Sequence, residues 1–256
     1  MPALGLMAAM DAELAAILPH LQGRHTTAHG GRVFHRGLWH GHAVVAVLSG
    51  IGKVAAATTA TLLHSVFGVD RLVFTGVAGG VGDAVRVGDV VLGEAFVQHD
   101  MDASPLFPRF ELPGLGRAVL PADAALTASL ADALDALHHC PVWREIQGSG
   151  LVRPEGSALH RGLILSGDRF VGDEALVSAL RGHWPEALAV EMEGAAVAQV
   201  CADLALPFAV MRTVSDRADS QAHVDFGAFL NSVASPMAAA WLDQWLQRAQ
   251  RKTAMA

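Results

Sequence analysis

Cysteine and positive charge are both scarce in this chain of 256 residues. Two cysteines, Cys140 and Cys201, are too few for a disulfide framework and too sparse for a thiolate metal cage, which favours a reducing cytoplasm. Lys and Arg total 18 against 25 Asp and Glu, which gives a net charge of −7. Because no global positive field attracts phosphate backbones or anionic lipids, neither nucleic acid nor a membrane is expected as a partner.

Long apolar runs and an N-terminal targeting pattern are also lacking. The longest apolar stretches, such as Val54–Val69, contain Thr and His and stay below the roughly 18 residues of a membrane span. No basic residue precedes Arg24, and Asp11 is acidic, so a secretory signal is not expected. With 52% hydrophobic residues the chain can bury a large core, and its length fits one domain over residues 1–256.

Short apolar runs that end in glycine or an acid alternate with longer Ala- and Leu-rich segments of helical spacing, a pattern typical of an α/β protein. Strands are expected over Leu4–Ala9, Arg32–Leu38, Ala43–Ser49, Arg71–Thr75, Asp89–Phe96, Gly162–Ser166, Ala189–Glu191 and Phe208–Thr213. Helices are expected over Asp11–Leu18, Lys53–Phe67, Ala122–His138, Glu174–Leu180, Gly194–Leu204 and Phe226–Arg248. The last helix should kink or restart at Pro236. Pro141–Ser157 is polar and is predicted to be an insertion-like surface loop.

Polar and glycine-rich segments follow several of these strands. Ligands of open α/β sheets bind outside the carboxyl ends of strands, so the site is predicted there. The glycine-rich segments lack the third glycine that a dinucleotide fingerprint needs after Gly80 and Gly82, and the hydroxyl that a phosphate-binding loop needs after Lys53. Tight strand-to-helix turns are the alternative interpretation of these glycines.

Histidine is abundant, with 13 residues, but no metal-binding arrangement is visible. None lies in His-Glu-x-x-His order, and His138 and His139 are adjacent, so they cannot converge as i and i+4 ligands do. His99–Asp102 is predicted to be a polar turn at a strand end. Neither a metal nor a cofactor is expected.

Carboxylates at strand ends form the strongest chemical signal, namely Glu13, Glu191, Glu193 and Asp216. Such acids can also be helix N-terminal residues that interact with the helix dipole, an interpretation that fits Glu13 well. Their combination, in order, with the glycine-rich segments and with Ser215 favours a catalytic site.

Several segments, each weak alone, occur in order and at characteristic separations. They are Ala9-Met10-Asp11-Ala12-Glu13, Ser49-Gly50-Ile51-Gly52-Lys53-Val54-Ala55-Ala56, Thr75-Gly76-Val77-Ala78-Gly79-Gly80, Val87-Gly88-Asp89-Val90-Val91, Ser166-Gly167-Asp168-Arg169-Phe170, Val190-Glu191-Met192-Glu193 and Ser215-Asp216-Arg217-Ala218-Asp219. Together they resemble the 5′-methylthioadenosine/S-adenosylhomocysteine nucleosidase family of the nucleoside phosphorylase superfamily, from Gly5 to about Leu246. The resemblance implies a single-domain, three-layer α/β/α fold with a central mixed, twisted sheet. It also implies hydrolysis of 5′-thio-substituted adenosines to adenine and a thioribose.

The resemblance further implies catalytic roles. Asp216 is the expected acid that donates a proton to N7 of adenine, with Ser215 orienting it, and its pKa would have to be raised by burial. Glu13 is the expected base that holds and deprotonates water, and Arg212 would help to hold that water. Two separated carboxylates with these roles are also what inverting glycosidases use.

Substrate contacts follow from the same resemblance. Glu193 would accept hydrogen bonds from the ribose hydroxyls, with Met192 packing beneath the sugar, while Phe170 stacks on adenine and the Val171 backbone bonds its edge. The other residues expected to line the site are Met10, Ile51 and Phe226, around the 5′-alkylthio group, together with Val77 and Glu191. A homodimer is implied in which the loop Asp102–Pro113, with Phe107 and Pro113, completes the neighbour's 5′ pocket. Whether Leu106 or Phe107 crosses over stays open.

Alternative functions remain at this point. Val77 stands where many relatives have serine, and Met10-Asp11-Ala12-Glu13 replaces the phosphate-binding Gly-Asp-Pro turn of the superfamily, so a phosphorylase is disfavoured. Another purine nucleoside, such as a futalosine-type substrate, would use the same catalytic pair. A catalytically silent nucleoside-binding protein is the alternative of a different class.

Overall fold

A mixed β-sheet runs through the centre of the computed structural model, which describes residues 3–133, 140–152, 156–218 and 226–254. Its strands are β1 (Ala3–Ala8), β2 (Gln22–His29), β3 (Arg32–Trp39), β4 (His42–Leu48), β5 (Val69–Gly80), β6 (Val90–Gln98), β7 (Leu120–Pro121), β8 (Leu159–Ser166), β9 (Ala187–Glu191) and β10 (Phe208–Asp216). The strand order is β10-β6-β8-β9-β5-β1-β4-β3-β2. β1 pairs in parallel with β4 and β5, whereas β3 pairs antiparallel with β4, which confirms the predicted mixed sheet.

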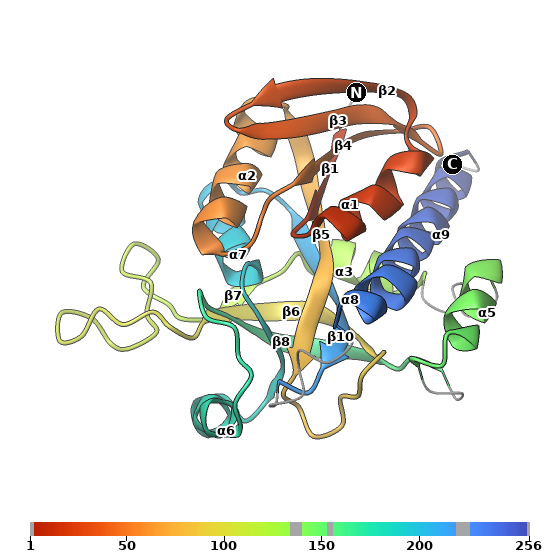
Figure 1. The fold of residues 1–256 in the computed structure, drawn as a ribbon. Coiled ribbons are helices and arrows are strands. Elements are labelled where there is room, and N and C mark those ends of the chain that lie inside the picture. The colour runs from red at the N-terminus through yellow and green to blue at the C-terminus, as the bar shows by residue number, and fades with distance from the viewer. Residues whose placement is uncertain (1–2, 134–139, 153–155, 219–225, 255–256) are drawn as a thin grey trace.

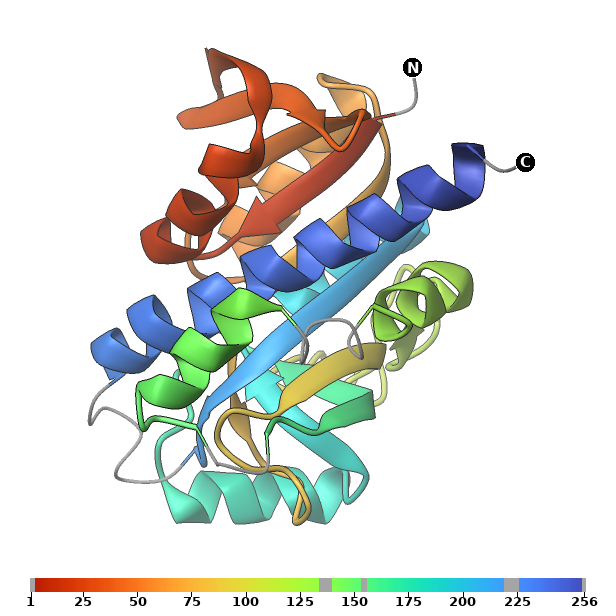
Figure 2. The same ribbon diagram turned by 90° about the vertical axis from the view of Figure 1, so that its right-hand side faces the viewer.

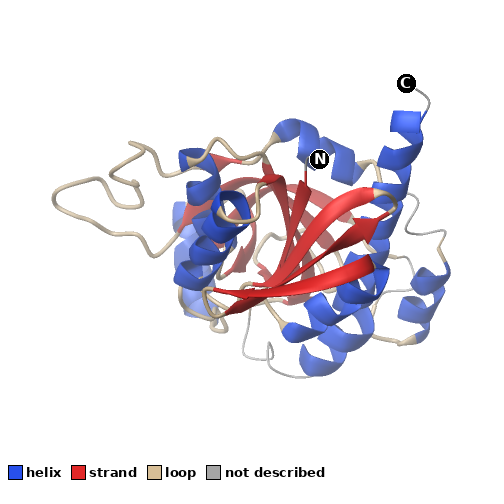
Figure 3. Ribbon diagram, turned by 90° about the horizontal axis from the view of Figure 1, so that it is seen from above, coloured by secondary structure: helices blue, strands red, loops and turns tan. Residues whose placement is uncertain are grey.

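Strand β5 is the junction of the sheet. It pairs in parallel with β1 and β10 and antiparallel with β9. Since β10 also pairs with β6, β6 with β8, and β8 with β9, this part of the sheet closes on itself. In Figure 3 the red strands gather between helices. The carboxyl ends of β1, β5 and β10 are thereby brought side by side, where the sequence predicts a site.

Helices cover both faces of the sheet, as Figures 1 and 2 show. They are α1 (Asp11–Ile17), the 3₁₀ turn Leu18–His20, α2 (Lys53–Ser65), α3 (Ala124–Ala131), α5 (Pro141–Gly148), α6 (Glu174–His183), α7 (Gly194–Asp203), α8 (Phe226–Phe229), the π-helical turn Leu230–Ala234 and α9 (Ser235–Ala254). Successive residues of β1 alternate between two cores: Leu6 packs with α1, α3 and α9, and Met7 packs with α2 and α7. The predicted three-layer α/β/α architecture is confirmed.

Some predicted elements differ from the structure. Pro141–Ser157 is not simply a loop, because its first half forms α5, which buries Trp143 and Ile146 against α9. Trp143 and Ile146 are three residues apart, as on one face of a helix, but the polar residues around them make the segment resemble a loop. Strand β2 is absent from the prediction because Gln22–His29 has no apolar alternation. In the structure this strand is exposed throughout and is held by pairing with β3.

The helical ends also shift. The helix predicted over Ala122–His138 begins at Ala124, after the Asp123 cap, and α3 ends at Ala131, followed by a turn. Residues 134–138 of the prediction lie outside the described residues. The C-terminal segment restarts at Ser235, next to Pro236, after a π-helical turn, which agrees with the predicted interruption. Within the residues described, no helix is long and apolar enough to cross a membrane.

Candidate active site

A cavity with an empty volume of about 670 Å³ opens at the carboxyl ends of β1, β5, β9 and β10. It brings together all of the predicted site residues except Phe107 and Pro113: Met10, Glu13, Ile51, Val77, Phe170, Val171, Glu191, Met192, Glu193, Arg212, Ser215, Asp216 and Phe226. Residues from segments far apart in the sequence therefore share one apolar chamber that contains several carboxylates.

Glu13 is buried in the first turn of α1 and does two things at once. Its Oε2 accepts hydrogen bonds from the backbone N–H groups of Ala9 and Met10, each at 3.0 Å, so it caps the helix as the dipole interpretation predicts. Its Oε1 has no hydrogen-bond partner among the described residues and belongs to a side chain that lines the cavity. Burial raises the pKa of Glu13 above its ordinary 4.5, against the opposing charge of Arg212 and nearby amides. A carboxylate oxygen without a partner is suited to hold a water molecule.

Arg212, on β10, is fully buried and fixed by an ion pair. Its Nη2 and Nε donate to Oε2 of Glu191 at 2.6 and 3.1 Å, and its guanidinium lies 4.2 Å from the ring centre of Phe74. A Cβ added at Gly76 would lie 2.9 Å from Nη1 of Arg212 and 3.4 Å from Oε1 of Glu13. Gly76 therefore leaves the space in which this cation and the Glu13 carboxylate approach each other.

Glu191 has a largely structural position. It accepts backbone hydrogen bonds from Glu193 and Gly194 at the start of α7, and Ser166 Oγ donates to its Oε1. The carboxylate therefore holds the start of α7 and pairs with Arg212.

Glu193, the residue before α7, also lines the cavity. Its Oε1 accepts a hydrogen bond of 2.8 Å from the backbone N–H of Gly52, and its Oε2 lies 3.7 Å from Nη2 of Arg212. Burial, and next the charge of Glu191, raise the pKa of Glu193 from 4.5 to about 7, with Arg212 and Gly52 opposing the rise. This carboxyl is thus positioned by the turn before α2 and sensitive to pH near neutrality.

Asp216 ends β10 at a different part of the cavity wall. Its Oδ1 accepts from the backbone N–H of Ala218 at 2.7 Å, and Ser215 Oγ lies 2.7 Å from its Oδ2. A Cβ at Gly79 would lie 2.9 Å from Oδ1 of Asp216. Gly76 and Gly79, three residues apart on β5, thus make room for Arg212 and Asp216 respectively. Such a spacing spans roughly 10 Å of strand.

The Thr75–Gly80 segment extends the strand predicted over Arg71–Thr75, and the strand-to-helix turn considered for Gly80 and Gly82 is not found in this described part of the chain. It is the last part of β5 itself, and the next element is strand β6. Gly52, by contrast, does lie in a strand-to-helix turn, with φ of +98° before α2. The glycines of β5 are required by close side-chain approach, a reason that the sequence alone does not reveal.

Phe170 and Val171 form the remaining wall together with apolar residues. Phe170 is 46% exposed, whereas Val171 is buried, and both line the cavity. Met10, Ile51 and Phe226 line the same cavity. Ala9, Gly76, Ala78, Gly79, Arg169 and Val190 also line it and were not predicted as site residues, although most belong to segments already recognised.

Phe107 and Pro113 do not line this cavity. They lie in the segment between β6 and β7, which projects from the body in Figures 1 and 3. Leu106 is 84% exposed and Phe107 38%. The predicted polar turn after β6 is present at His99 and Asp100. In the described part of the chain, no three His, Cys, Asp or Glu side chains are grouped to hold a metal ion.

Comparison with known proteins identifies the family. The sequence profile of the Phosphorylase superfamily matches residues 3–245. A 5′-methylthioadenosine/S-adenosylhomocysteine nucleosidase of Chromohalobacter salexigens is 36% identical over 234 residues, covering 91% of this chain and 92% of the relative. One of Colwellia psychrerythraea is 37% identical over 231 residues, covering 90% of each.

Solved structures agree. The nucleosidase of Neisseria meningitidis in complex with methylthio-immucillin-A matches with a TM-score of 0.85 and 32% identity, over 97% of this chain and all (100%) of that one. A futalosine hydrolase mutant of Helicobacter pylori matches with a TM-score of 0.84 and 30% identity, over 97% and 100% of the two chains. The chain belongs to the 5′-methylthioadenosine/S-adenosylhomocysteine nucleosidase family of the phosphorylase superfamily.

Proposed function

We propose that this protein hydrolyses the N-glycosidic bond of methylthioadenosine and S-adenosylhomocysteine, releasing adenine and the corresponding thioribose. The observation that carries the proposal is the placement of Glu13 and Asp216 on one cavity, with the Glu13 Oε1 unpartnered. The names of the relatives and the methylthio-immucillin-A complex of the Neisseria enzyme support the same substrates.

The mechanism assigns one proton transfer to each acid. As the bond from C1′ to adenine breaks, protonated Asp216 gives its proton to N7, and positive charge develops on the ribose. Water held at Oε1 of Glu13 attacks C1′ and passes a proton to that carboxylate, so nucleoside and water become adenine and thioribose. Ser215 orients Asp216. Burial strengthens the basicity of Glu13, because its raised pKa favours proton acceptance.

Substrate binding is assigned as the family resemblance implies. Glu193 accepts from the ribose hydroxyls above Met192, and Phe170 stacks on adenine beside the Val171 backbone. Met10, Ile51 and Phe226 enclose the 5′-alkylthio group, where a flexible methionine suits contact with a thioether. All of these residues line the same cavity.

Hydrolysis is favoured over phosphorolysis by the charges in the cavity. A phosphate dianion needs unengaged cations. Both arginines that line the cavity are already paired, Arg212 with Glu191 and Arg169 with Asp173. Glu13 and Glu193 add negative charge beside Arg212. Water is therefore the better nucleophile for this site.

A homodimer in the cytoplasm is part of the proposal. Leu106 and Phe107 are 84% and 38% exposed and lie in the segment between β6 and β7 that projects from the body in Figure 1. Val54 in α2 and Ile51 just before it are 78% and 59% exposed. Apolar surface of this extent is a solubility liability unless covered. We assign the loop Asp102–Pro113 to the 5′ pocket of a second copy, with Phe107 and Pro113 in contact with its substrate.

The test is adenine release from methylthioadenosine with and without phosphate. Equal rates, with free methylthioribose as the second product, support hydrolysis. An absolute phosphate requirement would indicate a phosphorylase, and no turnover would indicate a silent binder. Futalosine belongs in the same panel because of the similarity to the Helicobacter pylori futalosine hydrolase structure. Faster release of the purine base from futalosine than of adenine from methylthioadenosine would replace the proposed substrate.

A further inference from the structure

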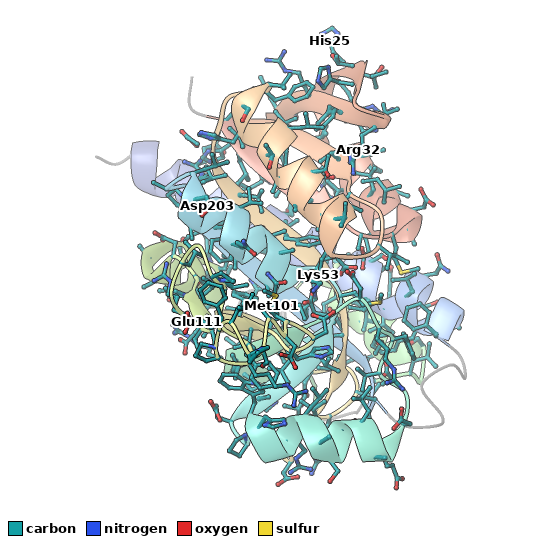
Figure 4. The ribbon with its side chains drawn as sticks, turned by 90° about the vertical axis from the view of Figure 1, so that its left-hand side faces the viewer. His25, Arg32, Lys53, Met101, Glu111 and Asp203 are labelled. Atoms are coloured by element: carbon teal, nitrogen blue, oxygen red, sulfur yellow. The ribbon has the colours of Figure 1, made fainter. Side chains whose placement is uncertain are left out.

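Lys53, outside the cavity, closes a ring of hydrogen bonds that joins three strand-end segments. Its backbone N–H donates to Oδ1 of Asp168 at 2.8 Å, and its Nζ donates to Oδ1 of Asp100 at 2.6 Å. The backbone N–H of Asp168 donates to Oδ2 of Asp100 at 2.9 Å, which completes the ring. Figure 4 shows Lys53 at the start of α2 near Met101, the residue after Asp100. The turn before α2, the end of β6 and the end of β8 are thus tied together.

A further chain of hydrogen bonds connects the ring to α7. Lys53 Nζ also donates to Oε1 of Gln98 at 3.2 Å, and Gln98 in turn donates to Gln199 of α7 at 2.7 Å. Burial alone would raise the pKa of Asp100, but the hydrogen bond from Lys53 and the Asp168 amide hold it below its ordinary 3.8. Asp100 is therefore charged at neutral pH and uses both oxygens to hold the ring.

Residues next to the ring in sequence connect it to the proposed substrate-binding residues. Gly52, directly before Lys53, donates its N–H to Oε1 of Glu193, and a Cβ at Gly52 would lie 3.0 Å from Oδ1 of Asp168. Asp168 lies two residues before Phe170, which lines the cavity. The backbone N–H groups of Gly52 and Lys53, at the N-terminal end of α2, thus hold the carboxylates of Glu193 and Asp168. The positive end of the helix dipole favours this arrangement.

We propose that Lys53 is a positioning residue for ribose recognition: with Asp100 and Asp168 it fixes the start of α2, so that the Gly52 amide orients Glu193 toward the sugar hydroxyls. This inference rests on the proposed function. The energetic reason is that Lys53 Nζ supplies the cation for the partly buried Asp100 carboxylate, which also holds the Asp168 amide. Without this cation the side-chain link between the start of α2 and the end of β6 is lost. A purely structural ion pair would change stability, but would not make the loss depend on a substrate hydroxyl.

The test compares Lys53→Met and Asp100→Asn with wild type. The two bonds end on different oxygens of Asp100. Asn replaces one of these oxygens with an NH2 group, which would face a donor, so Asp100→Asn breaks the ring with little change in shape. Arg161→Met is the matched control, because Arg161 on β8 pairs with Glu94 on β6 at 2.9 Å, joining the same two strands away from the cavity. For each variant, kcat/KM is measured with methylthioadenosine and with its 2′-deoxy and 3′-deoxy analogues, alongside thermal unfolding.

Each ring variant should lose about tenfold or more in kcat/KM with methylthioadenosine. With at least one deoxy analogue the loss should shrink to about threefold or less, because the hydroxyl that Glu193 binds is absent. Arg161→Met should retain wild-type kcat/KM. Equal losses on all three substrates, or no loss, would overturn the inference while leaving hydrolysis intact. Failure of the wild type to release adenine from methylthioadenosine would instead refute the proposed function.

Discussion

Replacement of Glu193 by glutamine tests the electrostatics of the site through stability. The substitution keeps the side-chain shape, and the amide oxygen can still accept the hydrogen bond from Gly52. It removes one negative charge from a buried group in which Glu193 lies near Glu191 and 3.7 Å from Arg212. We expect a more stable protein at alkaline pH and a less active one at every pH.

The magnitude follows from the pKa of Glu193, raised from 4.5 to about 7 mainly by burial. Between these values the folded protein keeps a proton that the unfolded chain has lost, so the free energy of unfolding falls as pH rises through this window. The full penalty, about 3 kcal/mol, is reached above the folded-state pKa. Glutamine carries no such penalty. Glu193→Gln should therefore gain up to about 3 kcal/mol over wild type at about pH 8.5 and almost nothing at about pH 4.

The assay is urea unfolding at both pH values, followed by tryptophan fluorescence, since the chain has five tryptophans. Protein concentration is held fixed because the proposed dimer would contribute to the apparent stability. A variant that is less stable than wild type at the alkaline pH would refute the reasoning, as would an equal difference at both pH values. Greater stability with lost activity would show that Glu193 is retained at a cost to the fold.

The remaining predictions concern the cation, the glycine beside it and the projecting loop. Arg212→Met leaves Glu191 buried without its partner and should lower the free energy of unfolding by about 3–5 kcal/mol in urea titrations. Adding Glu191→Gln should recover most of this loss, and additive losses would contradict the pairing. Gly76→Ala places a methyl group 2.9 Å from Nη1 of Arg212. Its rate of adenine release should fall about tenfold or more, whereas Gly182→Ala, with no atom within 4 Å, should keep the wild-type rate; an unchanged rate in Gly76→Ala would exclude the steric argument. Phe107→Ala should raise KM for methylthioadenosine without lowering the unfolding temperature, and an unchanged KM would argue against its role in the neighbour's pocket.

The sequence predicts much of the cavity because its chemistry is concentrated at strand ends. Periodicity places the carboxyl ends of β1, β5 and β10, and a parallel sheet brings such ends together. Glu13, Glu193 and Asp216 follow directly from this logic and line one cavity in the structure. The dual role of Glu13, with one oxygen capping α1 and the other unpartnered, shows that the helix-cap and the catalytic interpretations are compatible.

Other features depend on contacts between distant segments, which local patterns do not encode. The Lys53–Asp100–Asp168 ring joins residues more than 100 positions apart in the chain, with a separation of 115 between Lys53 and Asp168. Gly76 and Gly79 are needed because Arg212 and Asp216 approach β5 from another strand. Strand β2 forms by pairing with β3 despite its exposed, polar sequence. Tertiary pairing decides these cases, and propensity does not.

The central claim is that Glu13 and Asp216 divide two proton transfers across one glycosidic bond. Its most direct test is adenine release from methylthioadenosine by wild type, Glu13→Gln and Asp216→Asn in phosphate-free buffer, with circular dichroism to verify folding. Each variant should fold and should lose about 100-fold or more of the wild-type kcat. A folded variant of either residue that retains most of the wild-type kcat would contradict the account.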